Sequence, residues 1–259
     1  MPEPRGPKTP SVISKPNTRR RPADAVAPAE IADCAPPRKP KLTRTLPLVI
    51  ETDDHIRDGV RYLRRRCALV RGMHDLAGDP PLRRRTPGFE GLARIIIGQQ
   101  LSVASAAAIW SRFEATLPDM SAAALVATDD DALRASGLSR PKIRTLRAAS
   151  EAITGGLDLA RLETMTDDDI HAALTAITGI GPWTADIFIM FCLGRPDAFA
   201  KGDLALQIAA QYALARDARL TADELDVLAE RWRPWRAVAA RLLWSYYKVV
   251  KDARSGVPA

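Results

Sequence analysis

The sequence is poor in cysteine and in aromatic residues, and it has no long apolar run. Its three cysteines are widely separated among 259 residues, too few for a framework of several disulfides or for a four-cysteine zinc or iron–sulfur site. No stretch approaches the roughly 20 apolar residues of a membrane-spanning helix, so we expect no membrane partner. The first residues lack the apolar segment of a signal peptide, and this, with the scarce cysteine, predicts a cytoplasmic protein.

The positive charge of the chain is concentrated in its first residues. The net charge is +7, and residues 1–45 carry +6 of it, from ten basic and four acidic side chains. Ten of the twenty prolines also lie in this segment, which has no aromatic residue, so we expect a disordered basic arm. Such an arm either keeps the protein in solution or attracts nucleic acid non-specifically, and the sequence leaves both interpretations open.

Residues 46–259 are predicted to form a helical domain, built as one compact body or as two helical lobes. Apolar residues recur at three- and four-residue spacing, as in the stripe of Ile56, Val60 and Leu63. Alanine is abundant, no long alternating strand pattern occurs, and Thr221 precedes acidic residues that suit a first helical turn. The expected fold class is therefore all-α.

A glycine-rich turn between two predicted helices carries the most information. The segment Thr178-Gly-Ile-Gly-Pro-Trp-Thr184 is typical of helix, tight turn and helix, with Ile180 placed to plug into the core. The amides of Gly179, Gly181 and Thr184 would then face outward at a helix N-terminus, which suits a nucleic-acid phosphate of any sequence. On these residues alone, an ordinary helical hairpin with a glycine turn is the simpler interpretation.

Three further segments have plain structural interpretations when each is taken singly. Asp203, twenty residues after Trp183, is a suitable N-cap for the helix predicted to follow it. Gln99–Ser102 is a polar turn between two apolar stripes, and Trp232–Arg236 with Trp244 is an aromatic cluster in a core. Their order along the chain, rather than any one of them, points to a function.

Taken together, these segments resemble the helix-hairpin-helix DNA glycosylase superfamily, and within it the bacterial 3-methyladenine DNA glycosylase II branch that acts on alkylated bases. The resemblance covers roughly residues 50–250 and rests on the order and spacing of four blocks. It implies an all-α helix-hairpin-helix glycosylase fold of two helical lobes with the active site in the cleft. The blocks are Phe89–Ser102; Gly137-Leu138 with Lys142; Thr178–Ala185 with Asp203; and Trp232–Arg236 with Trp244.

The resemblance also implies roles for single residues. Asp203 falls at the family's catalytic carboxylate, and Gln100 falls at the residue that wedges into the base stack. Trp183 stands where bifunctional members carry a Schiff-base lysine, which implies a monofunctional enzyme. No cofactor is required, although the family's hairpin holds a Na⁺ or K⁺ ion beside the phosphate. The full set is Asp203 for catalysis; Trp183, Trp244 and Ile187 for the base pocket; Gly179, Gly181, Thr184, Gln100 and Ser102 for DNA; and the carbonyls of Thr175, Ile177 and Ile180 for the cation.

The expected function is excision of alkylated purines, 3-methyladenine and also 7-methylguanine, from double-stranded DNA in base excision repair. The resemblance further implies a monomer associated with a bacterial nucleoid. Ile187 replaces a stacking tyrosine of the best-known bacterial relative, so uracil, hypoxanthine and 8-oxoguanine stay open as alternative substrates. A non-catalytic helix-hairpin-helix DNA-binding protein is the alternative from another class. It is disfavoured because a phosphate binder gains nothing from a carboxylate such as Asp203 near DNA.

Overall fold

The computed structural model describes residues 49–255, and all regular structure within them is helical. The arm predicted for residues 1–45 lies outside the described residues. No helix in the described range is long and apolar enough to cross a membrane. The α-helices are α1 (Asp53–Arg66), α2 (Ala68–Ala77), α3 (Phe89–Gly98), α4 (Val103–Thr116), α5 (Ala122–Ala127), α6 (Asp130–Ala135), α7 (Arg140–Thr154), α8 (Asp167–Thr175), α9 (Pro182–Phe191), α10 (Leu204–Ala213), α11 (Ala222–Ala229) and α12 (Arg236–Ser255), with 3₁₀ helices η2 (Arg161–Thr164) and η3 (Glu230–Trp232).

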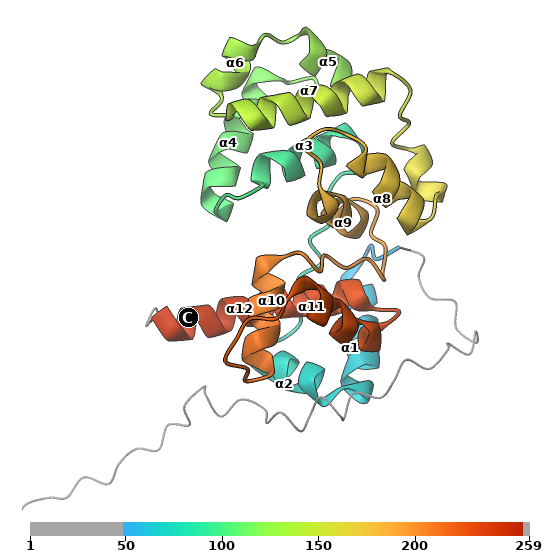
Figure 1. The fold of residues 1–259 in the computed structure, drawn as a ribbon, viewed down its shortest axis with the longest axis vertical. Coiled ribbons are helices and arrows are strands. Elements are labelled where there is room, and N and C mark those ends of the chain that lie inside the picture. The colour runs from blue at the N-terminus through green and yellow to red at the C-terminus, as the bar shows by residue number, and fades with distance from the viewer. Residues whose placement is uncertain (1–48, 256–259) are drawn as a thin grey trace, which may run out of the picture.

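All regular structure in the described residues is helical, which confirms the all-α prediction. The helices form two lobes rather than one compact body (Figure 1). A central lobe consists of α3 to α9, in which α7 packs on α3 and α5, and α9 packs on α3 and α8. A terminal lobe combines both ends of the described chain, because α1 and α2 pack with α10 and α12. The central lobe is therefore an insertion between the two halves of the terminal lobe.

Local sequence explains where the helices begin and which face they bury. In α1 the side chain of Thr52 accepts the amide of His55 at 3.3 Å, and the stripe of Ile56, Val60 and Leu63 is buried. In α11 the Thr221 hydroxyl accepts the Glu224 amide while the Glu224 carboxylate accepts the Thr221 amide, a complete capping box. The acids after Thr221 thus mark a helix start, as the sequence predicts.

Two segments of chain cross between the lobes, residues 78–88 and residues 192–203, and they are joined to each other. The Arg85 amide donates to the Phe191 carbonyl at 3.0 Å, and Arg84 Nη1 donates to the Cys192 carbonyl at 2.9 Å. Burial raises the pKa of the Cys192 thiol to about 12, so this thiol is a core group rather than a nucleophile. The paired crossings thus lie between the C-terminus of α9 and the N-terminus of α10, at the lobe junction.

Candidate functional site

Asp203 lies at the junction of the lobes and is hydrogen-bonded to an indole from each. Its Oδ2 accepts Trp183 Nε1 at 2.8 Å, and its Oδ1 accepts Trp244 Nε1 at 3.1 Å. Trp183 is the second residue of α9 in the central lobe, whereas Trp244 belongs to α12 in the terminal lobe. The structure therefore brings together three of the predicted site residues from positions 183, 203 and 244.

The same carboxylate is the N-cap of α10, so the structural interpretation of Asp203 also holds. Its Oδ1 accepts the Leu206 amide at 3.0 Å, which fixes the carboxylate at the N-terminus of that helix. Oδ2 accepts only the Trp183 indole among the described residues, which leaves it acceptor capacity for a ligand. A half-buried carboxylate held by donors from three helices is a fixed negative charge at the lobe junction.

The aromatic surroundings differ in part from the expected base pocket. The ring of Phe191 lies 5.6 Å from that of Trp244 at an interplanar angle of 32°, so Phe191 packs against Trp244. Ile187, which we expected to line the pocket, is only 5% exposed and belongs to the core. No role for Phe191 was expected from the sequence.

The hairpin between α8 and α9 has the expected tight turn. Gly179 has φ +88°, and a Cβ added there would lie 2.0 Å from Thr145 Oγ1 of α7, so only glycine fits. The Ile180 amide donates to the Ile177 carbonyl at 3.0 Å, and the Ile180 side chain is buried as predicted. The turn is thus shaped by its own hydrogen bond and by the close contact with α7.

The hairpin amides agree only in part with the predicted phosphate site. Within residues 49–255 the amides of Gly179 and Gly181 donate to no other backbone group, so they can meet an external acceptor. The Thr184 amide does not face outward as expected, because it donates to the Gly181 carbonyl at 3.0 Å and the residue is 2% exposed. At Gly181 an added Cβ meets nothing within 4 Å, so the fold itself does not require glycine there.

The loop between α3 and α4 is fastened to the hairpin and to α7. Gln99 Nε2 donates to Thr184 Oγ1 at 2.8 Å. Lys142 Nζ, on α7, donates to the carbonyls of Ile97 at 2.5 Å and Gln99 at 3.0 Å, where α3 ends. Burial lowers the pKa of Lys142. These contacts, which sequence reasoning missed, hold the loop and the hairpin as one unit.

The two predicted DNA contacts of this loop have different surroundings. Gln100 is exposed with φ +56°, at the tip of the turn before α4. Ser102 is the N-cap of α4, since its Oγ accepts the Ser105 amide at 3.1 Å. Leu101 is 38% exposed and Val103 is 89% exposed, so two exposed apolar side chains follow Gln100 in the chain. The loop therefore presents an exposed polar residue next to an exposed apolar one.

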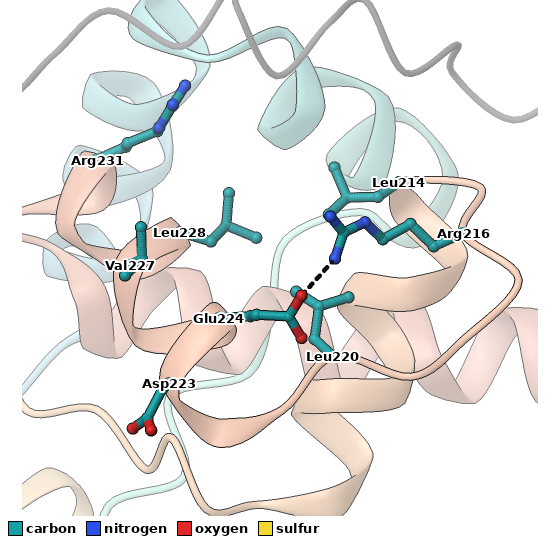
Figure 2. A pocket seen from close by; sticks show the side chains of 8 residues that line it. All are labelled: Leu214, Arg216, Leu220, Asp223, Glu224, Val227, Leu228 and Arg231. Carbon is teal, nitrogen blue, oxygen red and sulfur yellow. Dashed lines mark hydrogen bonds and ion pairs between the residues drawn. The ribbon is translucent and has the colours of Figure 1, made fainter.

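A separate pocket of about 410 Å³ lies in the terminal lobe (Figure 2). Leu220 and Leu228 belong to its apolar lining, and an Arg216–Glu224 ion pair of 3.0 Å lies among the residues drawn. None of the predicted site residues lines this pocket. It is therefore distinct from the Asp203 site.

Comparison with known proteins gives a matching family and several relatives of the chain. Residues 93–236, more than half of it, match the HhH-GPD superfamily of base excision DNA repair proteins. YfjP of Bacillus subtilis is 38% identical over 90 residues, which cover 35% of this chain but only 31% of that protein. DNA-3-methyladenine glycosylase 1 of Schizosaccharomyces pombe is 30% identical over 176 residues, 62% of this chain and 73% of that protein.

A solved structure extends the similarity to the fold. The S. pombe 3-methyladenine DNA glycosylase in complex with abasic DNA superposes with a TM-score of 0.68 at 26% identity, over 72% of this chain and 95% of that one. The helical fold of this chain is thus similar to that of a known repair protein. The chain belongs to the HhH-GPD superfamily of base excision DNA repair proteins.

Proposed function

We propose that the protein is a monofunctional DNA glycosylase that removes alkylated purines from double-stranded DNA by hydrolysis of the N-glycosidic bond. The observation that carries the proposal is the convergence of Trp183 and Trp244 on the carboxylate of Asp203. The relatives support it, since the matched S. pombe proteins are named 3-methyladenine DNA glycosylases and one was solved with abasic DNA.

The chemistry needs little beyond these groups. Alkylation at N3 of adenine or N7 of guanine makes the base cationic and a good leaving group, so a strong general acid is unnecessary. A fixed carboxylate such as Asp203 stabilises the positive charge that develops on the sugar and orients water. The indole faces attract a cationic base, an interaction of about 2 kcal/mol when desolvated. The damaged base must first leave the duplex, which costs least where pairing is weak.

The DNA backbone would be held by the hairpin and the adjoining loop. The amides of Gly179 and Gly181 are suited to a phosphate oxygen, and the exposed Gln100 is suited to filling the space of the extruded base. The carbonyls of Thr175, Ile177 and Ile180 would hold a Na⁺ or K⁺ ion, which would supply positive charge near the DNA backbone. We infer a monomer that needs no other cofactor.

Asp203→Asn is the experiment that tests the function. Asparagine keeps an oxygen for the Leu206 amide, so α10 stays capped and the variant folds. The lost charge should slow single-turnover excision of 3-methyladenine by about 10²- to 10³-fold, while DNA affinity changes little.

The product of the unchanged protein should be an intact abasic site that breaks only in alkali, because Trp183 has no amine for a Schiff base.

The outcomes separate the alternatives. Excision by Asp203→Asn at the unchanged rate would leave Asp203 as a helix cap only. A panel of duplexes with 3-methyladenine, 7-methylguanine, hypoxanthine, uracil and 8-oxoguanine identifies the substrate, and faster removal of a neutral base would contradict the preference for alkylated purines. Binding without release of any base would identify a non-catalytic DNA-binding protein.

A further inference from the structure

Arg241 is a fully buried cation beside the aromatic residues of the site. It lies on α12 and is only 2% exposed. Its three hydrogen-bond acceptors within the described residues are all backbone carbonyls, Leu82 at 3.1 Å, Ala237 at 2.9 Å and Met190 at 3.1 Å. Burial lowers the pKa of this guanidinium to about 9, with a further lowering by Arg84 and Arg83. Neutral carbonyls recover only part of the cost of burying a charge, so stability alone is a weak reason for an arginine here.

The three carbonyls come from different parts of the fold, which fixes the plane of the guanidinium. Met190 lies near the end of α9 in the central lobe, Ala237 begins the helix that carries Arg241, and Leu82 belongs to the crossing from α2 to α3. A guanidinium is planar and its donors form a rigid fork, so these bonds set both its position and its tilt. Arg241 thereby joins the two lobes.

A stack of side chains leads from this fixed plane to the carboxylate. The guanidinium carbon of Arg241 lies 4.7 Å from the centroid of the Phe191 ring. Phe191 packs against Trp244, and Trp244 Nε1 donates to Asp203 Oδ1 at 3.1 Å. Each member limits the position of the next, because closely packed aromatic rings and a single indole donor allow little freedom.

We infer that Arg241, acting through Phe191, is a positioning residue that sets the orientation of the Trp244 indole toward Asp203 and couples that orientation to the docking of the two lobes. The inference rests on the proposed function for its effect on excision, but the orientation of Trp244 is a property of the folded chain. Losing the flat guanidinium should tilt Phe191 and then Trp244, which misplaces one wall of the site without touching DNA.

Three variants and one control test the inference. Arg241→Lys keeps a positive charge and loses the plane, Arg241→Met loses both, and Phe191→Leu removes the ring between Arg241 and Trp244. The control is Arg147→Met in the central lobe. Arg147 also donates to three backbone carbonyls, those of Leu125, Val126 and Thr128, but it joins α7 to the chain around α5 and contacts no site residue.

The first readout is the indole N–H cross-peak of Trp244 in a ¹H–¹⁵N spectrum, assigned with Trp244→Phe. It should shift in all three variants and stay in place in Arg147→Met. The second readout is single-turnover excision below the melting temperature, which should fall about ten- to a hundredfold in the variants while the affinity for duplex DNA stays within about threefold.

The results distinguish the two proposals. An unmoved Trp244 cross-peak in Arg241→Lys and Phe191→Leu overturns the positioning role, whatever the excision rate. Equal loss of excision in Arg147→Met and Arg241→Met, in proportion to lost stability, also overturns it. A shifted cross-peak in a protein that excises no base would keep the positioning role and reject the glycosylase. If Arg241→Met fails to fold, Phe191→Leu and Arg241→Lys still decide.

Discussion

Gly179 and Gly181 stand two residues apart in the hairpin, yet the chain needs glycine at each for a different reason. Gly179 has a left-handed backbone and touches Thr145, so its requirement comes from inside the protein. Gly181 has φ −96° and open space around its Cβ direction. The proposed function offers a reason for a glycine that the fold does not need, because a DNA phosphate would have to approach the backbone closely there.

Gly181→Ala should therefore leave the thermal midpoint nearly unchanged and weaken binding to duplex DNA by about tenfold, equal to about 1.4 kcal/mol. Gly179→Ala should instead destabilise folding by about 2–4 kcal/mol through backbone strain and the clash with Thr145. Calorimetry and a binding titration on the two purified variants give both numbers. A Gly181→Ala protein that binds DNA at full affinity would remove the hairpin amides from the interface.

At this scale the candidate site residues could be named from the sequence, but their contacts could not. The resemblance to a known family singled out Asp203, Trp183 and Trp244, but it did not give the two indole-to-carboxylate bonds, which join residues 20 and 41 positions apart. The prediction that the Thr184 amide faces outward was wrong, because the direction of that amide depends on the backbone angles at Gly181. Local pattern says nothing about such geometry.

At the scale of single helices, α9 contains an acidic residue in an unfavourable environment. Burial raises the pKa of Asp186 to about 7, against the opposing effect of Lys201 and Arg236, and Asp226 raises it slightly further. His171 Nε2 of α8 lies 3.8 Å from Asp186 Oδ1, too far for a hydrogen bond. The folded protein thus favours the neutral form of this carboxyl on α9, beside the α8–α9 hairpin.

The pH dependence of stability follows from that shift. An unfolded aspartate loses its proton near pH 4, whereas Asp186 in the folded chain keeps it until about pH 7. Between these values the folded state binds more protons, so stability should fall as pH rises from about 4 to 7 and then level off, by at most about 4 kcal/mol. Asp186→Asn should flatten this part of the profile and raise stability at pH 8.

The control for this prediction is Asp168→Asn, which neutralises an exposed carboxylate on α8. Urea unfolding at pH 5, 6, 7 and 8 on the three proteins measures the profile. If Asp186→Asn and the unchanged protein lose stability in parallel over that range, Asp186 is charged in the folded state and the predicted shift is wrong.

Helix positions were the most predictable feature of the elements. The cap at Thr221 and the start of α10 after Asp203 follow from short-range rules, because a capping side chain meets an amide two or three residues ahead. The pairing of α2 with α12 could not be predicted in the same way. It depends on which apolar faces meet after the chain has passed through the whole central lobe.

At the scale of the whole molecule, charge is divided unequally between the arm and the rest of the chain. Residues 1–45 carry +6 of the net +7, and they lie outside the described residues. The remaining chain has a net charge of +1, so it would attract a phosphate backbone only through its local geometry.

Deletion of residues 1–45 should leave the single-turnover excision rate at saturating protein unchanged. It should weaken non-specific duplex binding and reduce the slope of log affinity against log salt, by at most about nine if all ten basic side chains contact phosphates. Titrations at 50, 100 and 200 mM salt, with the full chain measured in parallel, provide the comparison. Equal slopes would assign the arm to keeping the protein in solution.

The terminal lobe is made from the first and last helices, and this has a consequence for the order in which the chain becomes structured. During synthesis α1 and α2 emerge early, but α10 and α12, against which they pack, are made last. The apolar stripes of α1 and α2 must stay uncovered while the central lobe is translated and folds. The newborn chain should therefore be most prone to aggregation, and most dependent on chaperones, in the interval before α12 leaves the ribosome.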